Sequence, residues 1–299
     1  MDLIHQVTDA YLKTVEGSDA ARLGFLQGLW EIQSHIEAVD RPYEAPDSDI
    51  AREAYVTGQP LFLVSAPEVP LAEYVDAVSQ VARYASEMTG LPAEQAQALL
   101  SADFSAVIDK DRLAGAVRSP DTFVAQVVTE LGVQLSGPLT PAAVAFVLVS
   151  ALVPFLTGPS AAAQQALGVP DPNALTSGNC PVCGSSATMG RVEESSKLNG
   201  AARTLWCGLC HAEWNYERIR CVRCGTRNPD MLRYTHVEAD PAHRVHLCDE
   251  CHGYTRFVFV DDLDKPVSMV VEDVMTATLD AVATEHGYTA TGDGGKASN

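Results

Sequence analysis

The chain is poor in basic side chains: 20 lysines and arginines stand against 39 aspartates and glutamates, a formal net charge of −19 over 299 residues. Because phosphate contacts need a net basic face, nucleic acid is not expected to be the main partner. The start of the chain also lacks the basic segment and apolar run of a signal peptide, which predicts a cytoplasmic protein.

Long apolar runs are missing as well. The most apolar stretch, 142–156, is shorter than the ~20 residues that cross a bilayer, and Pro154 interrupts it. We therefore expect a buried core helix and no membrane insertion. With 46% hydrophobic residues, the chain can still build a large core in one or two domains.

Cysteine is absent from residues 1–179 and 252–299, and the segment between them holds all eight cysteines as four Cys-x-x-Cys pairs. The pairs are Cys180/Cys183, Cys207/Cys210, Cys221/Cys224 and Cys248/Cys251. Adding 41 to any of the first four positions gives one of the second four, and a fixed period indicates a duplicated structural unit. Gly184 and Gly225 follow two of the pairs and can supply the positive φ that closes a tight turn.

Two residues between cysteines let one turn direct two thiolates at one ion, and two such turns complete a tetrahedral site of four sulfurs. We therefore predict two metal sites, the first formed by Cys180, Cys183, Cys207 and Cys210, the second by Cys221, Cys224, Cys248 and Cys251. An interleaved pairing is the alternative, although the repeat favours sequential units. The ligands suit zinc or iron without choosing between them. Four protein ligands leave no open position for a substrate, so we do not expect an enzyme.

Two other interpretations of these residues stay open. The segments 207–211 and 248–252 match Cys-x-x-Cys-His, the attachment pattern of c-type haem, but haem would leave two cysteine pairs unexplained. Arginines cluster near the start of the second repeat, at Arg218, Arg220, Arg223 and Arg227, with Trp206, Trp214 and Tyr216 nearby. Such residues suit a protein partner better than nucleic acid, or they screen the thiolate charge.

The region before the cysteines predicts a helical domain over residues 1–172. Helical spacing or capping signals mark the segments 1–40, 71–89, two shorter helices within 92–118, 120–135, and an apolar helix from Thr140-Pro141 to Gly158-Pro159. The segment 58–70 carries three prolines and is expected to be extended.

The rest of the chain predicts two β-modules and a helix, so the expected fold class is α+β: a helical domain followed by two tandem rubredoxin-like or zinc-ribbon modules and a C-terminal helix. The expected boundaries are 173–219 and 220–265 for the ribbons, 266–288 for the helix and 289–299 for a disordered tail. Each ribbon should be a hairpin, turning at Asn199-Gly200 or at Asp240-Pro241.

The cysteine segments and the closing segments 271–280 and 285–288 resemble the formate dehydrogenase accessory protein family, FdhE. The resemblance implies a cytoplasmic maturation factor, needed for activity, that binds the catalytic subunit of a molybdenum- or tungsten-dependent formate dehydrogenase. It also implies rubredoxin-like iron sites at the eight cysteines. Two other functions compete with this one: a rubredoxin-like electron-transfer protein and a nucleic-acid-binding zinc-ribbon module.

Overall fold

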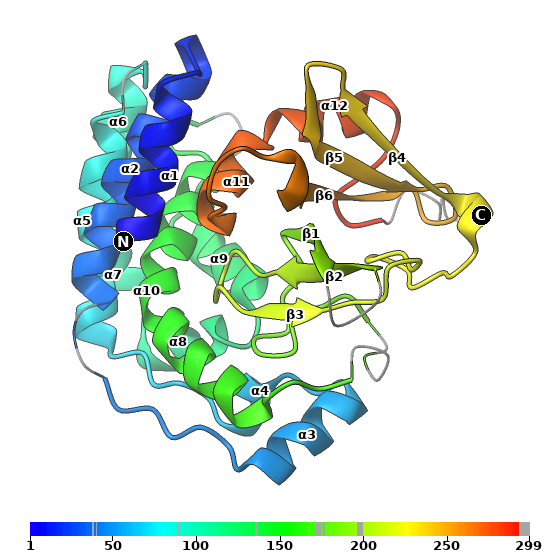
Figure 1. Ribbon diagram of the computed structural model, residues 1–299. Coiled ribbons are helices and arrows are strands. Elements are labelled where there is room, and N and C mark those ends of the chain that lie inside the picture. Colours follow the sequence, from blue (N-terminus) through cyan, green and yellow to red (C-terminus); the bar gives the residue numbers. More distant parts are fainter. Residues whose placement is uncertain are drawn as a thin grey trace, which may run out of the picture.

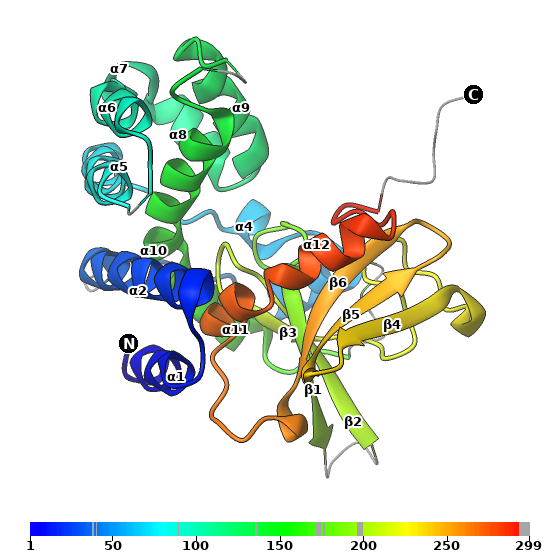
Figure 2. The ribbon, with the colours of Figure 1, turned by 90° about the horizontal axis from the view of Figure 1, so that it is seen from above.

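A computed structural model describes residues 1–37, 39, 41–88, 90–134, 137–171, 175, 177–195 and 200–292. Its N-terminal part is helical, and its C-terminal part is built on one sheet, which gives the α+β class that the sequence predicted (Figure 1). Seen from above, most of the N-terminal helices lie on one side of the molecule and the sheet on the other, with α11 (Met269–Met275) between them and α12 (Thr278–Glu285) beside β6 (Figure 2).

The helical region is organised around one long apolar helix, α10. Its helices are α1 (Asp2–Leu12), α2 (Gly17–Glu37), α3 (Ser48–Thr57), α4 (Leu61–Val64), α5 (Leu71–Ser86), α6 (Ala93–Ser101), α7 (Phe104–Val107), α8 (Lys110–Ala116), α9 (Pro120–Glu130) and α10 (Pro141–Leu167). Helix α10 contacts α2, α3, α5 and α9, so most of its large side chains are buried. Thr140 caps the start, because its Oγ1 accepts the N–H of Ala143.

Helix α10 does not end at Gly158-Pro159 as predicted, but continues through both of its prolines. Each proline removes one backbone donor and leaves the carbonyl four residues earlier without its helical partner. For Pro154 that carbonyl is Ser150 O, and the side-chain amide of Gln33 on α2 donates to it at 2.8 Å. At 27 residues, α10 is longer than the predicted stretch and could span a bilayer by length and composition, but half of its most apolar window is buried in the protein.

The prediction of an extended 58–70 segment is wrong at its centre. Leu61 and Phe62 begin the short helix α4, and their N–H groups donate to the carbonyls of Pro181 and Val182, each at 2.9 Å. The first N–H groups of any helix lack partners within the helix, so these carbonyls complete the turn. Segment 92–118 likewise holds three short helices, α6 to α8, instead of two.

The strands in the described part of the chain join in one six-stranded sheet of order β3-β2-β1-β6-β5-β4. The strands are β1 (Met189–Ser195), β2 (Gly200–Trp206), β3 (Glu213–Asn215), β4 (Leu232–Val237), β5 (Asp240–Cys248) and β6 (Gly253–Phe259). Each repeat supplies three consecutive antiparallel strands, and the two sets join where β1 pairs with β6 in parallel. The two expected ribbons therefore share a single sheet.

The junction between β1 and β6 depends on a glycine. Gly190 pairs with Phe257, and a Cβ at Gly190 would lie 2.3 Å from the Phe257 ring and 2.8 Å from the carbonyl oxygen of Thr204. Only a residue without a side chain lets the ring of Phe257 lie over β1 here. Phe257 is fully buried in the main core, so this contact joins the two repeats.

The second hairpin turns at residues 238–239, because Val237 pairs with Asp240. The predicted turn residues Asp240 and Pro241 lie instead at the start of β5, where the Asp240 carboxylate accepts a hydrogen bond from His243. In the first hairpin Gly200 pairs with Ser195, and Asn199 lies outside the described residues.

The C-terminal segment holds two helices instead of the single one predicted for 266–288. Arg256 donates to the carbonyl oxygen of Asp273 at 2.7 Å and to the hydroxyl of Thr276 at 3.0 Å. Since a continuing helix needs that carbonyl for Ala277, the guanidinium competes with the helix, which breaks before α12. The predicted disordered tail is also wrong in part, because Thr289 bridges Gly253; residues 293–299 lie outside the described part.

A buried polar network connects the first helix, the sheet and the C-terminal helices. His243 on β5 donates through Nδ1 to Asp240 at 2.7 Å and through Nε2 to Glu272 at 2.8 Å, and the hydroxyl of Tyr11 donates to the same Glu272 oxygen at 2.7 Å. Glu272 is fully buried. Burial alone lowers the pKa of His243, but the hydrogen bonds and charges of Asp240 and Glu272 outweigh it and raise the pKa to about 9.

This network predicts a loss of stability in mild base. The unfolded pKa of histidine is about 6.5, so the contribution of protonated His243 is complete below that pH and is lost as the pH rises through about 9. The free energy of unfolding, measured with urea, should fall by about 3 kcal/mol over this range.

The variant His243→Gln should remove most of that pH dependence. The control variant His286→Gln, at an exposed position outside this network, should keep it. An equal pH profile for the wild type and His243→Gln would contradict the assignment.

Candidate metal centres

Each of the four Cys-x-x-Cys pairs forms the same turn. The residue after the second cysteine has a positive φ in every case: 85° at Gly184, 57° at His211, 78° at Gly225 and 53° at His252. At Gly184, His211 and Gly225 the N–H donates to the carbonyl of the first cysteine of the pair, at 2.9 to 3.1 Å. The two histidines of the haem-like pattern therefore close these turns as the glycines do, which leaves the cysteines directed at one another.

The turns bring the eight cysteines together as two quartets, in the sequential pairing predicted by the repeat. Within each quartet all four sulfurs lie within 4.8 Å of one another. The Sγ atoms of Cys180 and Cys210 are 3.6 Å apart, and those of Cys183 and Cys207 are 3.5 Å apart. In the second quartet, the Sγ–Sγ distance is 3.8 Å both between Cys221 and Cys251 and between Cys224 and Cys248.

These separations fit a metal ion. A tetrahedral site with metal–sulfur bonds of ~2.3 Å has sulfur–sulfur edges of about 3.8 Å. A disulfide would need sulfurs ~2.05 Å apart, and all eight cysteines are free thiols. Each quartet can thus hold one ion with four protein ligands. Zinc there would only fix the turns, and iron would add one-electron redox chemistry.

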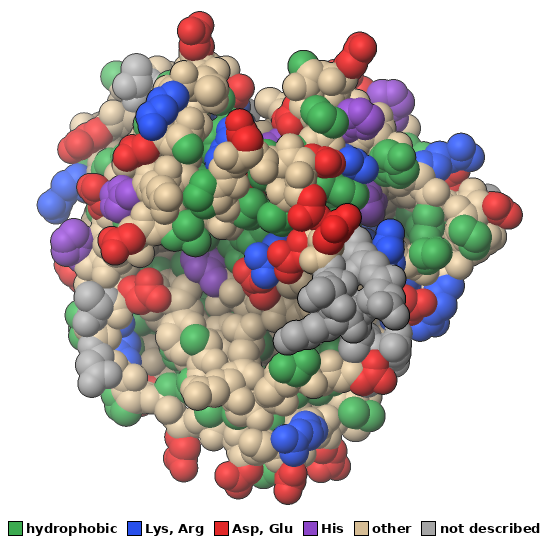
Figure 3. Space-filling view, in the orientation of Figure 1, with side chains coloured by type: hydrophobic (Ala, Val, Ile, Leu, Met, Phe, Trp, Pro, Cys, Tyr) green, Lys and Arg blue, Asp and Glu red, His purple; other side chains and the backbone are tan. Residues whose placement is uncertain are grey.

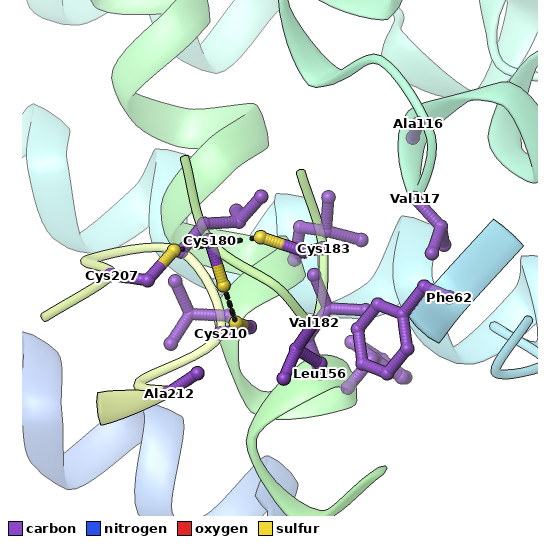
Figure 4. Close-up of a cluster of buried hydrophobic side chains, with 14 of the residues drawn as sticks. Phe62, Ala116, Val117, Leu156, Cys180, Val182, Cys183, Cys207, Cys210 and Ala212 are labelled. Carbon is purple, nitrogen blue, oxygen red and sulfur yellow. Dashed lines mark hydrogen bonds between the residues drawn. The ribbon is translucent and has the colours of Figure 1, made fainter. Parts of the chain in front are cut away.

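The first quartet lies inside the main core. All four of its cysteines are buried, with Cys207 and Cys210 fully so, and they pack beside Val182, Phe62 and Leu156 (Figure 4). The first turn is held from outside by α4, which donates to the carbonyls of Pro181 and Val182. This centre therefore connects the helical domain to the sheet.

The second quartet lies near the surface. Cys224 is exposed and Cys251 is half-buried. The Sγ of Cys221 accepts the backbone N–H groups of Arg223 and Cys224, at 3.3 and 3.5 Å. The Arg223 side chain donates to the carbonyls of Tyr254 and Ala187, so it joins the turn to both repeats. Solvent can reach this centre, unlike the first.

Without a cation, four adjacent thiols cannot all ionise. In the first quartet, burial and the neighbouring sulfurs raise the pKa of Cys180 and Cys210, while hydrogen bonds from Cys180 and the other thiols lower that of Cys183. In the second, burial raises the pKa of Cys248 to about 11. Metal binding must therefore displace protons, and acid should weaken it.

The arginines singled out in the sequence have different partners in the structure. One further arginine with several partners was not predicted. Arg227 forms an ion pair with Glu217, and Arg220 donates to the carbonyls of Gly225 and Leu175. Arg203, missed from the sequence, is 5% exposed and donates to the carbonyls of residues 217, 218 and 220. Strand alternation could have found it, since it shares a face of β2 with the buried Leu205.

Comparisons with known proteins cover the cysteine region in sequence and 96% of the chain in fold. Residues 179–218 match the family model "FdhE, central domain", and residues 219–294 match "FdhE, C-terminal domain". The "Protein FdhE homolog" of Shewanella baltica (strain OS223) is 34% identical over 112 residues, which is 38% of this chain and 36% of the relative. That of Aquifex aeolicus (strain VF5) is 32% identical over 111 residues, 36% of this chain and 38% of the relative.

The chain is also similar in fold to "The crystal structure of the FdhE protein from Pseudomonas aeruginosa", with a TM-score of 0.59 and 20% identity over 96% of this chain and 90% of that one. The fold and the two quartets define a protein in which a helical domain is joined to one sheet. Two repeats build that sheet, and each repeat contributes one quartet of cysteines. Residues 179–294 of this chain match the two FdhE family models, and the same region is similar in sequence to FdhE proteins. Its matched segment spans little more than a third of the length of the curated relatives.

The difference in burial predicts that the two centres lose metal at different rates. In zinc-loaded protein, a chelator should remove one ion per chain at least about tenfold faster than the other, a ratio that needs ~1.4 kcal/mol of barrier difference. The fast phase should disappear in Cys224→Ser, which opens the exposed centre, and the slow phase in Cys183→Ser. Release of both ions at one rate would show that burial does not control access.

Proposed function

We propose that this chain is an accessory protein that binds the catalytic subunit of a formate dehydrogenase in the cytoplasm and is needed for assembly of the active enzyme. The observation that carries the proposal is the match of its two-quartet region to the FdhE family models. The resemblance of this chain to the FdhE family implies a role in the maturation of formate dehydrogenase.

The chemistry of the centres supports a role in assembly in which this chain converts no substrate. Each quartet offers four protein ligands to one ion, so a bound metal has no open position for a substrate. The first centre is enclosed by the core, where it stabilises the contact between the helical domain and the sheet. We therefore propose no catalytic residue and assign the metal ions a structural role.

Co-purification tests the proposed partner. Tagged, metal-loaded protein should retain the catalytic subunit of a formate dehydrogenase from the same cell under anaerobic conditions, and should not retain the catalytic subunit of another molybdenum enzyme. Removal of the gene should abolish formate dehydrogenase activity without lowering the amount of the catalytic subunit's messenger RNA. A folded, metal-loaded chain that retains no formate dehydrogenase subunit counts against the proposal.

Exposure of Cys224 favours a second candidate function, electron transfer through a rubredoxin-like iron at the second centre. Iron there should show a thiolate absorption band that bleaches on reduction and returns on oxidation, and Cys224→Ser should remove that signal. Protein purified from cells with two tightly held zinc ions excludes this function, because zinc has no redox chemistry.

A further inference from the structure

A cavity of about 240 Å³ lies beside the second metal centre, and its charge is unusual for this chain. Five arginines line it, with no aspartate or glutamate among the lining residues that the structure describes: Arg203, Arg218, Arg220, Arg223 and Arg233. The chain as a whole carries −19. Several basic side chains gather at the right of the space-filling view, around the end of the sheet that carries β4, while acidic ones are scattered over the rest of this face (Figure 3).

The arginines of the cavity differ in whether a carboxylate of this chain already neutralises their positive charge. Arg233 forms an ion pair with Asp249. Within the described part of the chain, no carboxylate lies within ion-pair distance of Arg203, Arg218 or Arg223. Arg203 and Arg223 donate to backbone carbonyls, which orient a guanidinium but do not cancel its charge.

Two donors remain for a ligand. The Nε of Arg203 is buried and has no hydrogen-bond partner among the described residues, although a buried donor without a partner costs roughly 1–3 kcal/mol. The guanidinium of Arg218 is exposed, and no acceptor among the described residues is within hydrogen-bond reach of it. Burial lowers the pKa of Arg203 to about 10, so it keeps its charge at neutral pH.

The shape of the cavity restricts the ligand. It is smaller than the ~300–1,000 Å³ of sites for drug-sized molecules, so it suits a small anion or the acidic end of a longer molecule. Its rim carries Ile219, which is 58% exposed, and Tyr234, which is 63% exposed. Guanidinium groups match the oxygens of phosphate in pairs, and several arginines suit an anion with more than one charge.

We propose that this cavity is a binding site for a small phosphate-bearing ligand, whose oxygens are held by Arg203 and Arg218 beside the second metal centre. The site does not depend on the assembly role, because the arginines and the cavity belong to this chain alone. The thiolate quartet that borders the cavity through Cys221 and Cys248 offsets part of the positive charge, but it leaves the Arg203 Nε without an acceptor.

Isothermal titration of the metal-loaded, full-length protein with inorganic pyrophosphate, at constant ionic strength, tests the site. We expect saturable binding of one pyrophosphate per chain and a shift of the Arg203 Nε–H resonance in the NMR spectrum. Arg218→Ala should weaken binding by about tenfold or more, the effect of one charge-assisted hydrogen bond. The matched control is Arg227→Ala, because Arg227 is exposed on the same segment but is paired with Glu217 and does not line the cavity.

Four results would overturn the proposal. One is the absence of binding by folded, metal-loaded protein. Another is equal weakening by Arg218→Ala and Arg227→Ala, which indicates unspecific charge attraction. The third is tighter binding of a glutamate-rich peptide than of pyrophosphate, which assigns the cavity to an acidic protein segment. Metal content, measured in parallel, must be unchanged in Arg218→Ala; loss of the second ion there would mean that this arginine only balances the thiolates.

Discussion

Repulsion between converging thiolates is the constraint on which the rest of this structure depends. Four sulfurs held 3.5 to 3.8 Å from a neighbour can all be ionised only around a cation, so each quartet is complete only with its metal. The strands begin and end at these turns: β2 ends beside Cys207, β5 ends at Cys248, and β6 begins two residues after Cys251. Metal ions bound there would fix the strand ends, and the parallel contact of β1 with β6 combines the two units into one sheet.

The duplicated centres are equal in geometry but differ in surroundings, and the helical domain is the cause. Helix α4 donates two backbone hydrogen bonds to the first turn, and Pro60 lies 2.9 Å from where a Cβ of Gly184 would be, so the first quartet is covered. Nothing equivalent covers Cys224 in the described part of the chain. One copy can thus serve as a permanent link between domains, while the other stays open to solvent, chelators or a partner. Because the two copies are unequally buried, the first centre suits a structural role and the second centre stays accessible.

The sequence was most informative where chemistry depends on local spacing. The Cys-x-x-Cys pairs and their period were sufficient to predict both quartets, because each turn is determined by a few neighbouring residues. The sequence could not show that Gln33 would satisfy the carbonyl freed by Pro154, or that Arg256 would take the carbonyl needed to continue a C-terminal helix. Both partners are distant in sequence, so local propensity pointed to the wrong helix ends. The single sheet was missed for the same reason, since the pairing of Gly190 with Phe257 joins separate repeats.

The buried arginines show how this acidic chain uses its few positive charges. Arg256 is neutralised by Asp273 and Asp280 and lies against the C-terminal helices. Arg203 instead holds carbonyls of the linker between the repeats, and Arg223 holds the carbonyls of Ala187 and of Tyr254 in β6; the fixed fork of each guanidinium reaches several acceptors at once. Carbonyl oxygens satisfy donors without supplying a full negative charge, so the field of these arginines persists in the cavity beside the second centre. The same arginines that hold the repeats together through backbone carbonyls therefore make that end of the sheet attractive to anions.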